Sequence, residues 1–292
     1  MGGVMQSRNT HTDDSYSWQL EYRQGLGEHL AASLSYLNEG HVPAHHRDGY
    51  AAQLWAHSPA FAQRLSLAAG IGPYYYFDTT EPQNGGGPYS DEHGWGGIFS
   101  LAATWSLESR WLFQMRANWV KTSDSMDTVS ALAGIGYQLE PSSKGPPPVP
   151  SVRPKKTTGN EVTLFAGQTI MNSFESEHST ALGAEYRRGL WRYVDWTASW
   201  LDEGAHRPNG PVTQLWAVKA FLNDRLALGV GGGVYLAVDH PFADHSSLST
   251  IVTLTGSYRF QPPWCLRVSW NRILTDDNRD ADVIVGGVGY RF

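Results

Sequence analysis

Large apolar residues alternate with polar or small residues along much of the chain. One face of segment 111–119 carries Trp111, Phe113, Met115 and Trp119, and the other face carries Gln114, Arg116 and Asn118. In segment 226–238 leucines and valines occupy one face, and alanine, glycines and Tyr235 occupy the other. Successive side chains of a β-strand point to opposite faces, so this period of two predicts strands.

The second half of the chain contains eight such segments. They span residues 161–171, 180–190, 193–203, 212–222, 225–239, 248–260, 263–275 and 281–292. Most are long enough to cross an outer membrane, which takes ~9–11 tilted residues. Short connections such as LNDR and FQPP alternate with longer ones such as DEGAHRPNGP. This alternation is typical of transmembrane β-barrels, and no run of about 18 apolar residues predicts a membrane-spanning helix.

The two halves of the chain align with each other. Trp111–Leu139 matches Trp264–Phe292 without a gap, and Leu65–Thr79 matches Leu226–His240 in the same way. Shorter matches follow the same order, among them Glu39-Gly40 with Glu203-Gly204. Such an ordered series indicates a tandem duplication.

The duplication predicts two domains, a first barrel in residues 1–139 and a second in residues 161–292. Residues 140–160 between them include six prolines and have no apolar periodicity, which indicates an extended linker. The alternative is a long disordered turn inside one domain. The segment GGVMQS (Gly2–Ser7) matches QTIMNS (Gln168–Ser173), so we expect the first copy to begin in mid-strand and to lack half a strand and a signal peptide.

The predicted fold class is all-β, with transmembrane antiparallel up-and-down β-barrels formed by a duplicated eight-stranded unit. The alternative is that all sixteen strands close into one barrel, because sixteen is a common number of strands in porins. We favour separate closure, since a single barrel needs only a short turn where the proline-rich stretch lies. A soluble pair of lipocalin-like barrels is disfavoured because it would turn its large apolar side chains inward.

The composition agrees with a barrel. Aromatic residues make up 12% and charged residues 17%, with a mean hydropathy of −0.38. The net charge of −6 argues against a nucleic-acid partner. Cys265 is the only cysteine, so the chain has no internal disulfide and no cysteine-based metal site. Nothing in the sequence implies a cofactor.

The chain ends in an alternating apolar strand in which Ile284, Val288, Tyr290 and Phe292 share one face. This end resembles the C-terminal strand of small bacterial outer-membrane barrels of the OmpA-, OmpX- and PagL-like class. The resemblance implies a bacterial outer-membrane location, outer-membrane lipid and lipopolysaccharide as partners, and the barrel-assembly machinery as a partner during biogenesis.

The ionic and amide residues of the strands fall mainly on the expected inner face. This polar lumen cluster consists of Glu21, Arg23, Arg116 and Asn118 in the first copy and Glu185, Arg187, Arg267 and Asn271 in the second. Charges in a narrow barrel must neutralise one another, because an unpaired buried charge is costly. We therefore expect a salt-bridged packed interior, with an ion or proton path as the alternative.

A second candidate site lies in the segment GHVPAHHRDG, which has the composition of a loop. It contains His41, His45, His46 and Asp48, residue types that bind metals or transfer protons. Their spacing matches no metal motif, so a metal is left undetermined. Carboxylates at equivalent strand ends, such as Asp78 with Asp239 and Asp127 with Asp280, are either polar caps or bridges through divalent cations to lipopolysaccharide.

No catalytic set can be assembled from the sequence, and DHSS (Asp244–Ser247) is only a weak histidine–serine pair. The expected function is therefore a structural, adhesive or envelope-maintenance role in the outer membrane, with a packed polar lumen. The alternatives are an outer-membrane enzyme acting on lipid A or phospholipid, and a sixteen-stranded conduit.

Overall fold

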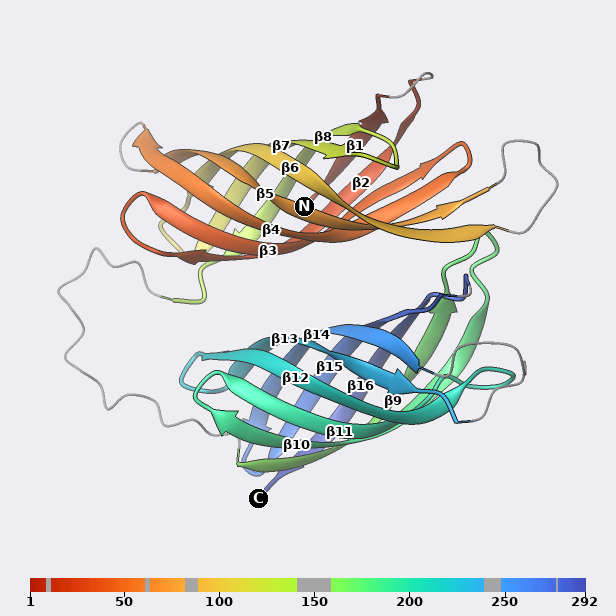
Figure 1. The fold of residues 1–292 in the computed structure, drawn as a ribbon. Helices are drawn as coiled ribbons and strands as arrows, with labels where there is room; N and C mark the ends of the chain where they lie inside the picture. Colours follow the sequence, from red (N-terminus) through yellow and green to blue (C-terminus); the bar gives the residue numbers. More distant parts are fainter. Residues whose placement is uncertain (9–11, 61–63, 82–88, 141–158, 239–247, 277) are drawn as a thin grey trace. The chain divides into compact units, whose positions relative to one another are not determined.

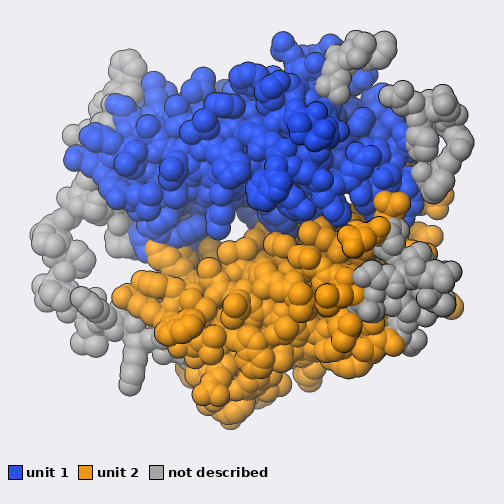
Figure 2. All heavy atoms as spheres, viewed as in Figure 1, with its two compact units in different colours: residues 1–141 blue, residues 142–292 orange. Residues whose placement is uncertain are grey.

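The computed structural model of the chain describes residues 1–8, 12–60, 64–81, 89–140, 159–238, 248–276 and 278–292. Sixteen strands account for its regular structure (Figure 1). Among the described residues there is no helix of the length and apolar character that crossing a membrane requires. The chain divides into two compact units, residues 1–141 and 142–292 (Figure 2). The predicted linker lies mostly in residues 141–158, outside the described residues.

Each unit is a closed barrel of eight antiparallel strands in sequence order. The strands of the first unit are β1 (Gly2–Ser7), β2 (Asp14–Gly25), β3 (Leu30–Val42), β4 (His45–Ala60), β5 (Leu65–Thr80), β6 (Ser90–Ser106), β7 (Trp111–Thr122) and β8 (Thr128–Tyr137). Those of the second unit are β9 (Asn160–Met171), β10 (His178–Trp191), β11 (Val194–Asp202), β12 (Asn209–Phe221), β13 (Leu226–Leu236), β14 (Leu248–Gln261), β15 (Trp264–Leu274) and β16 (Ala281–Arg291). The predicted all-β fold, with antiparallel up-and-down barrels formed by an eight-stranded unit, is confirmed.

The seam of each barrel shows that the copies close separately. In the second unit β9 pairs with β16 along its length, from Glu161 opposite Arg291 to Met171 opposite Ala281. The backbone groups of Asn160 and Phe292 extend this pairing with two hydrogen bonds. In the first unit β1 pairs with β8, and that register ends where Gly2 faces Ala133. The alternative of a single sixteen-stranded barrel is therefore wrong.

The strands bury their polar faces and expose their apolar faces. On β7 Arg116 and Asn118 are 3% and 2% exposed, whereas Phe113 and Met115 on the alternate face are 45% and 59% exposed. On β13 Tyr235 is buried and Val234 is exposed. Because successive strand residues alternate between faces, the polar set fills the interior of each barrel and the apolar set covers its outside.

In both copies a tryptophan side chain lies so close to the neighbouring strand that only glycine fits opposite it. Trp55 on β4 faces Gly70 on β5, and Trp216 on β12 faces Gly231 on β13. A Cβ added to either glycine would lie 2.6 Å from the indole ring. Each indole therefore lies against a bare backbone, which lets a tryptophan fit inside an eight-stranded barrel, where room exists only for side chains.

Candidate functional site in the barrel interiors

The first barrel contains a layer of charged side chains near the end at which residues 26–29 connect β2 to β3. Arg23 on β2 and Arg116 on β7 both approach Glu21 Oε1, with Nη2–Oε1 distances of 3.0 and 2.7 Å. Both guanidinium groups lie over the indole of Trp55, at 3.8 and 4.7 Å from a ring centroid. We name these four residues the first ionic layer. The structure thus brings together three of the residues that the sequence placed in the lumen.

The second barrel contains a corresponding layer around Trp216. Arg187 lies over that indole at 4.2 Å and pairs with Glu185 at 3.1 Å and, more loosely, with Asp195 at 3.7 Å. Arg267 does not bond Glu185; it bonds Glu161 on β9 instead. Arg291 also bonds Glu161, at 2.6 Å. This second ionic layer comprises Glu161, Glu185, Arg187, Asp195, Trp216, Arg267 and Arg291.

An amide layer with the same hydrogen-bond pattern lies within each barrel. In the first barrel Gln53 donates to the Ser100 hydroxyl at 2.9 Å, and that hydroxyl donates to Asn118 at 2.7 Å. In the second barrel Gln214 donates to Thr253 and Thr253 donates to Asn271, each at 2.8 Å. Asn118 and Asn271 are therefore held by their neighbours, as expected of interior packing rather than an open path.

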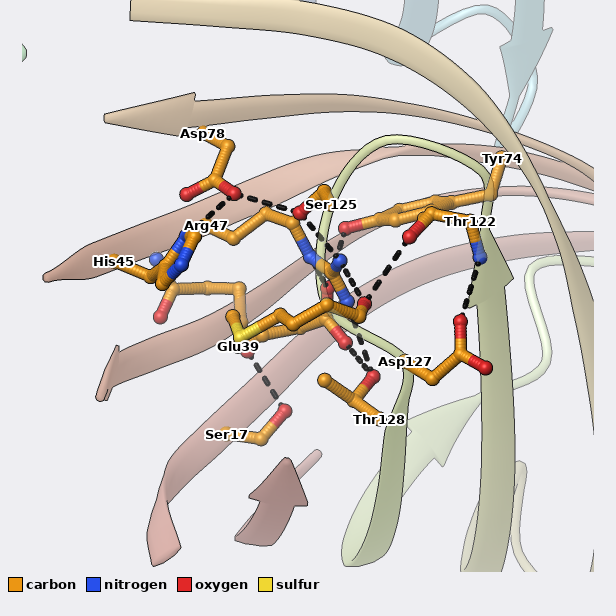
Figure 3. Close-up of polar contacts among 12 residues, drawn as sticks. Ser17, Glu39, His45, Arg47, Tyr74, Asp78, Thr122, Ser125, Asp127 and Thr128 are labelled. Atoms are coloured by element: carbon orange, nitrogen blue, oxygen red, sulfur yellow. Dashed lines mark hydrogen bonds and ion pairs between the residues drawn. The ribbon is translucent and has the colours of Figure 1, made fainter. Parts of the chain in front are cut away.

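A third group, the rim network, lies at the other end of the first barrel (Figure 3). Its centre is the fully buried Arg47 on β4, whose Nε bonds Glu39 at 2.6 Å. The remaining nitrogens of Arg47 donate to the Ser125 hydroxyl, the Met126 carbonyl and the Thr128 hydroxyl. Tyr74 and Thr128 donate to the Glu39 carboxylate. This network ties β3, β4 and β5 to the β7–β8 connection inside the barrel.

An irregularity in β3, where the β3–β4 register shifts between Asn38 and His41, contains Glu39, whose carboxylate is buried. Gly40 has a φ of 69°, and its N–H donates to the Asn38 side chain at 3.0 Å. The second copy repeats this local geometry, since Gly204 has a φ of 101° and its N–H donates to Asp202 at 2.9 Å. Positive φ favours glycine, which explains why Glu-Gly is one of the repeated pairs.

The second copy keeps this buried carboxylate without the arginine. Glu203 is 4% exposed, and Tyr235 takes the place of Tyr74 beside it. The position that aligns with Arg47 holds Pro208. Burial raises the pKa of Glu203 to about 7, although the nearby Arg207 acts in the opposite direction. Arg207 itself pairs with Glu177 at 3.7 Å.

The prediction that the histidine-rich segment forms a loop is wrong. Strand β3 continues to Val42 and β4 begins at His45, so only a two-residue turn separates them. His41 and His46 face each other across this hairpin with stacked rings 3.8 Å apart. His45 bonds Asp78 at 2.9 Å, and Asp48 accepts the hydroxyl of Tyr36 at 2.5 Å. The candidate residues therefore do not converge, and no metal-binding cluster occurs among the described residues.

Asp78 joins a serine and a histidine in an order that does not suit nucleophilic catalysis. Its Oδ2 accepts the Ser125 hydroxyl at 2.6 Å and contacts His45 Nδ1 at 2.9 Å. A catalytic triad instead places the histidine between the serine and the acid. The carboxylate here holds both side chains in the rim network (Figure 3).

Two of the strand-end carboxylates, Asp127 and Asp280, act as polar caps. Asp127 accepts the N–H of Thr122 and the ammonium of Lys121, both at 3.0 Å. Desolvation alone would raise the pKa of Asp127, but these hydrogen bonds hold it below its usual value. Asp280 accepts the N–H of Thr275 in the same way, at 2.8 Å. Asp239, the counterpart of Asp78, lies outside the described residues.

Sequence reasoning missed several central interior residues, namely Arg47, Glu161 and the tryptophans Trp55 and Trp216. The tryptophans carried a usable signal, because both copies contain Gln-Leu-Trp and the parity of the strand places each tryptophan on the face of the interior glutamine. Arg47 carried no such signal, since it is not repeated.

Comparisons with known proteins assign the chain to no family. No protein-family model and no curated protein matches the chain. A solved structure of the CymD monoaromatic hydrocarbon channel is 11% identical, with a TM-score of 0.24, and the match covers 100% of this chain and 87% of that chain. The toluene transporter TbuX of Ralstonia pickettii is 10% identical, with a TM-score of 0.23 and the same coverage. A mutant porin of Rh. blastica is 8% identical, with a TM-score of 0.21, covering 100% and 98% of the two chains.

These similar structures are thus a channel, a transporter and a porin. TM-scores this low carry no information about the function of this chain. The class of protein defined by the fold itself is a tandem of antiparallel up-and-down β-barrels, each closed by eight strands.

Proposed function

We propose that the protein resides in the bacterial outer membrane and that each of its two barrels crosses the lipid bilayer. Its proposed role is structural, adhesive or in envelope maintenance. The observation that carries this proposal is the inverted distribution of polarity. Large apolar residues such as Leu164 and Val268 are 66% and 60% exposed on the outer faces, while arginines fill the interior. A water-soluble barrel would gain from the opposite arrangement, because burying apolar surface drives folding in water.

The aromatic residues at the strand ends support the same proposal. Trp111 packs edge to face against Tyr137 at 5.1 Å, and the aligned pair Trp264 and Tyr290 packs in the same way at 5.2 Å. All four side chains are 44–48% exposed on the outer faces. Tryptophan and tyrosine form such belts at the interfaces of membrane barrels. Outer-membrane lipid and lipopolysaccharide are the partners that such a surface would meet.

The last strand supports a partner during biogenesis. Val288, Tyr290 and Phe292 expose their side chains along one outward row. We propose that this row is what the barrel-assembly machinery binds. Deleting Phe292 removes one outward side chain and the two backbone hydrogen bonds to Asn160, so we expect slower assembly into the membrane.

The interior favours a closed barrel over a conduit. Each ring has eight strands, and about eight strands leave room only for side chains. The ionic layers, the amide layers and the rim network occupy that room with side chains bonded to one another. We therefore place conduction of solutes below a structural or adhesive role.

The proposal is tested by exporting the protein with a signal peptide in a Gram-negative host. It should fractionate with the outer membrane and migrate faster on gels before heating than after. Recovery from the periplasm as a soluble monomer without detergent would contradict membrane residence. In planar bilayers the purified protein should give no steady pore, and a large constant conductance would contradict the packed lumen.

A further inference from the structure

The end of the second barrel that carries the short turns is rich in arginine. This end holds Arg188 on β10, Arg192 in the β10–β11 turn, Arg225 in the β12–β13 turn and Arg259 on β14. The first three side chains are exposed and that of Arg259 is half-buried. Among the described residues no carboxylate forms an ion pair with any of these four arginines, Asp224 in the β12–β13 turn included. We name the four residues the arginine rim.

Backbone hydrogen bonds match this end of the second barrel to the same end of the first. The N–H of Arg259 donates to the carbonyl of Arg225 at 2.7 Å. In the first barrel the N–H of Ser106 donates to the carbonyl of Arg64 at 2.8 Å. The sequence match between the copies gives the same correspondence, so Arg64 is the counterpart of Arg225 and Ser106 is the counterpart of Arg259.

The first barrel neutralises its arginine at this end, and the second barrel does not. Arg64 pairs with Glu108, with an Nη2–Oε1 distance of 2.7 Å. In the second barrel Gln261 occupies the position of Glu108, so Arg225 has no such partner. The second copy has therefore kept the cation and lost the carboxylate.

The connections β2–β3 and β10–β11 differ in the same direction. Gln24 and Glu28 in EYRQGLGEHL align with Arg188 and Arg192 in EYRRGLWRYV. Six aligned positions thus hold two glutamates and two arginines in the first barrel, but four arginines and no acid in the second. These positions are 24, 28, 64, 106, 108 and 110 in the first barrel and 188, 192, 225, 259, 261 and 263 in the second. The unpaired positive charge is therefore a property of the second barrel and not of the repeated unit.

Exposed aromatic side chains lie beside the arginine rim. Trp191 and Tyr193 flank Arg192 and are 68% and 49% exposed. The guanidinium carbon of Arg192 lies 4.9 Å from the ring centroid of Tyr193. Phe260 follows Arg259 and is 53% exposed. In a barrel that crosses lipid, such aromatic residues lie at the membrane interface, and arginine side chains there extend toward the headgroups.

We propose that the arginine rim binds the phosphate groups of anionic phospholipids in the leaflet that the short-turn end of the second barrel meets. This inference rests on the proposed membrane residence. The short turns of outer-membrane barrels lie on the periplasmic side, so this leaflet is the inner one. Guanidinium groups suit the task because their planar N–H donors can bond two phosphate oxygens at once.

The test is native mass spectrometry of the full-length protein in nonionic detergent, titrated with phosphatidylglycerol or with phosphatidylcholine. Both lipids carry a phosphate, but only phosphatidylglycerol has a net negative charge. The protein should bind phosphatidylglycerol at least tenfold more tightly. An arginine near an anionic membrane surface contributes about fivefold to affinity. The triple variant Arg188→Gln, Arg192→Glu and Arg259→Ser carries the residues of the first barrel, so its Kd for phosphatidylglycerol should rise by about 100-fold, with phosphatidylcholine binding unchanged.

The first barrel offers the reciprocal variant. Gln24→Arg, Glu28→Arg and Glu108→Gln together should add a second site that prefers phosphatidylglycerol. The matched control is Lys121→Gln, at the opposite end of that barrel, which should change the Kd of neither lipid.

Two outcomes separate this inference from the proposed function. Equal affinities for the two lipids, or a triple variant that keeps the preference, would overturn the inference and leave membrane residence standing. A protein that stays soluble without detergent and binds neither lipid would contradict both.

Discussion

Glu203 should make the second barrel less stable as the pH rises, and the substitution Glu203→Gln should remove this dependence. The side chain is buried in the β11–β12 connection and lacks the arginine that neutralises Glu39 in the first copy. A neutral amide of nearly the same shape reproduces the protonated carboxyl at every pH.

The magnitude follows from the pKa of Glu203, which burial raises from an ordinary 4.5 to about 7. Each pKa unit corresponds to about 1.36 kcal/mol, so a difference of this size corresponds to about 3 kcal/mol. The sign follows from proton binding. Between these pH values the folded state holds a proton that the unfolded state has released, so the contribution is fully present below pH 4.5 and is lost as the pH rises through 7.

The assay is urea-induced unfolding of the protein in detergent micelles, followed by gel mobility at several pH values from 4.5 to 8.5. At pH 8.5 Glu203→Gln should exceed the original protein in unfolding free energy by about 3 kcal/mol, and at pH 4.5 the two should be equal. The exposed Glu175→Gln, near the same end of the barrel, is the matched control and should leave the pH profile unchanged. A profile of Glu203→Gln that parallels the original protein at every pH would refute the reasoning.

Two further substitutions test the interior contacts. Arg47→Met leaves Glu39 buried without its cation, so the first barrel should lose about 3–5 kcal/mol of unfolding free energy in urea titrations, and an unchanged midpoint would contradict the buried ion pair. Gly231→Ala places a Cβ 2.6 Å from Trp216 and should cost about 1–3 kcal/mol, whereas the control Gly232→Ala meets nothing within 4 Å and should be neutral. Equal effects of the two glycine substitutions would contradict the position of the indole.

The strands could be predicted from the sequence because period-two patterning is local. The predicted segment 212–222 corresponds to β12 at Asn209–Phe221, and the duplication predicted the separate closure of the two sheets. The segment around His41 was misjudged because proline, aspartate and glycine have turn propensity, while the hairpin continues through them. Here pairing with the neighbouring strands overrides local preference.

The partners inside the barrels could not be predicted from parity alone. Parity places Arg267 on an inner face, but its partner Glu161 lies 106 residues away across the seam. That contact depends on the stagger between β9, β15 and β16, which no local pattern specifies. The registers place Asp195 opposite Trp216 and Ala31 opposite Trp55. Parity alone does not reveal that these two residues occupy corresponding interior positions.

The most direct test of the central claim is a spin-label measurement across one strand of the protein in lipid vesicles. With Cys265 replaced by serine, labels would be attached in turn at Leu266 and Val268, which face outward, and at Ser269, which is 5% exposed in the interior. The outward labels should be accessible to oxygen dissolved in the lipid and shielded from a water-soluble nickel reagent, and the Ser269 label should be shielded from lipid. Free access of the nickel reagent to Leu266 and Val268 would contradict a barrel that crosses the membrane.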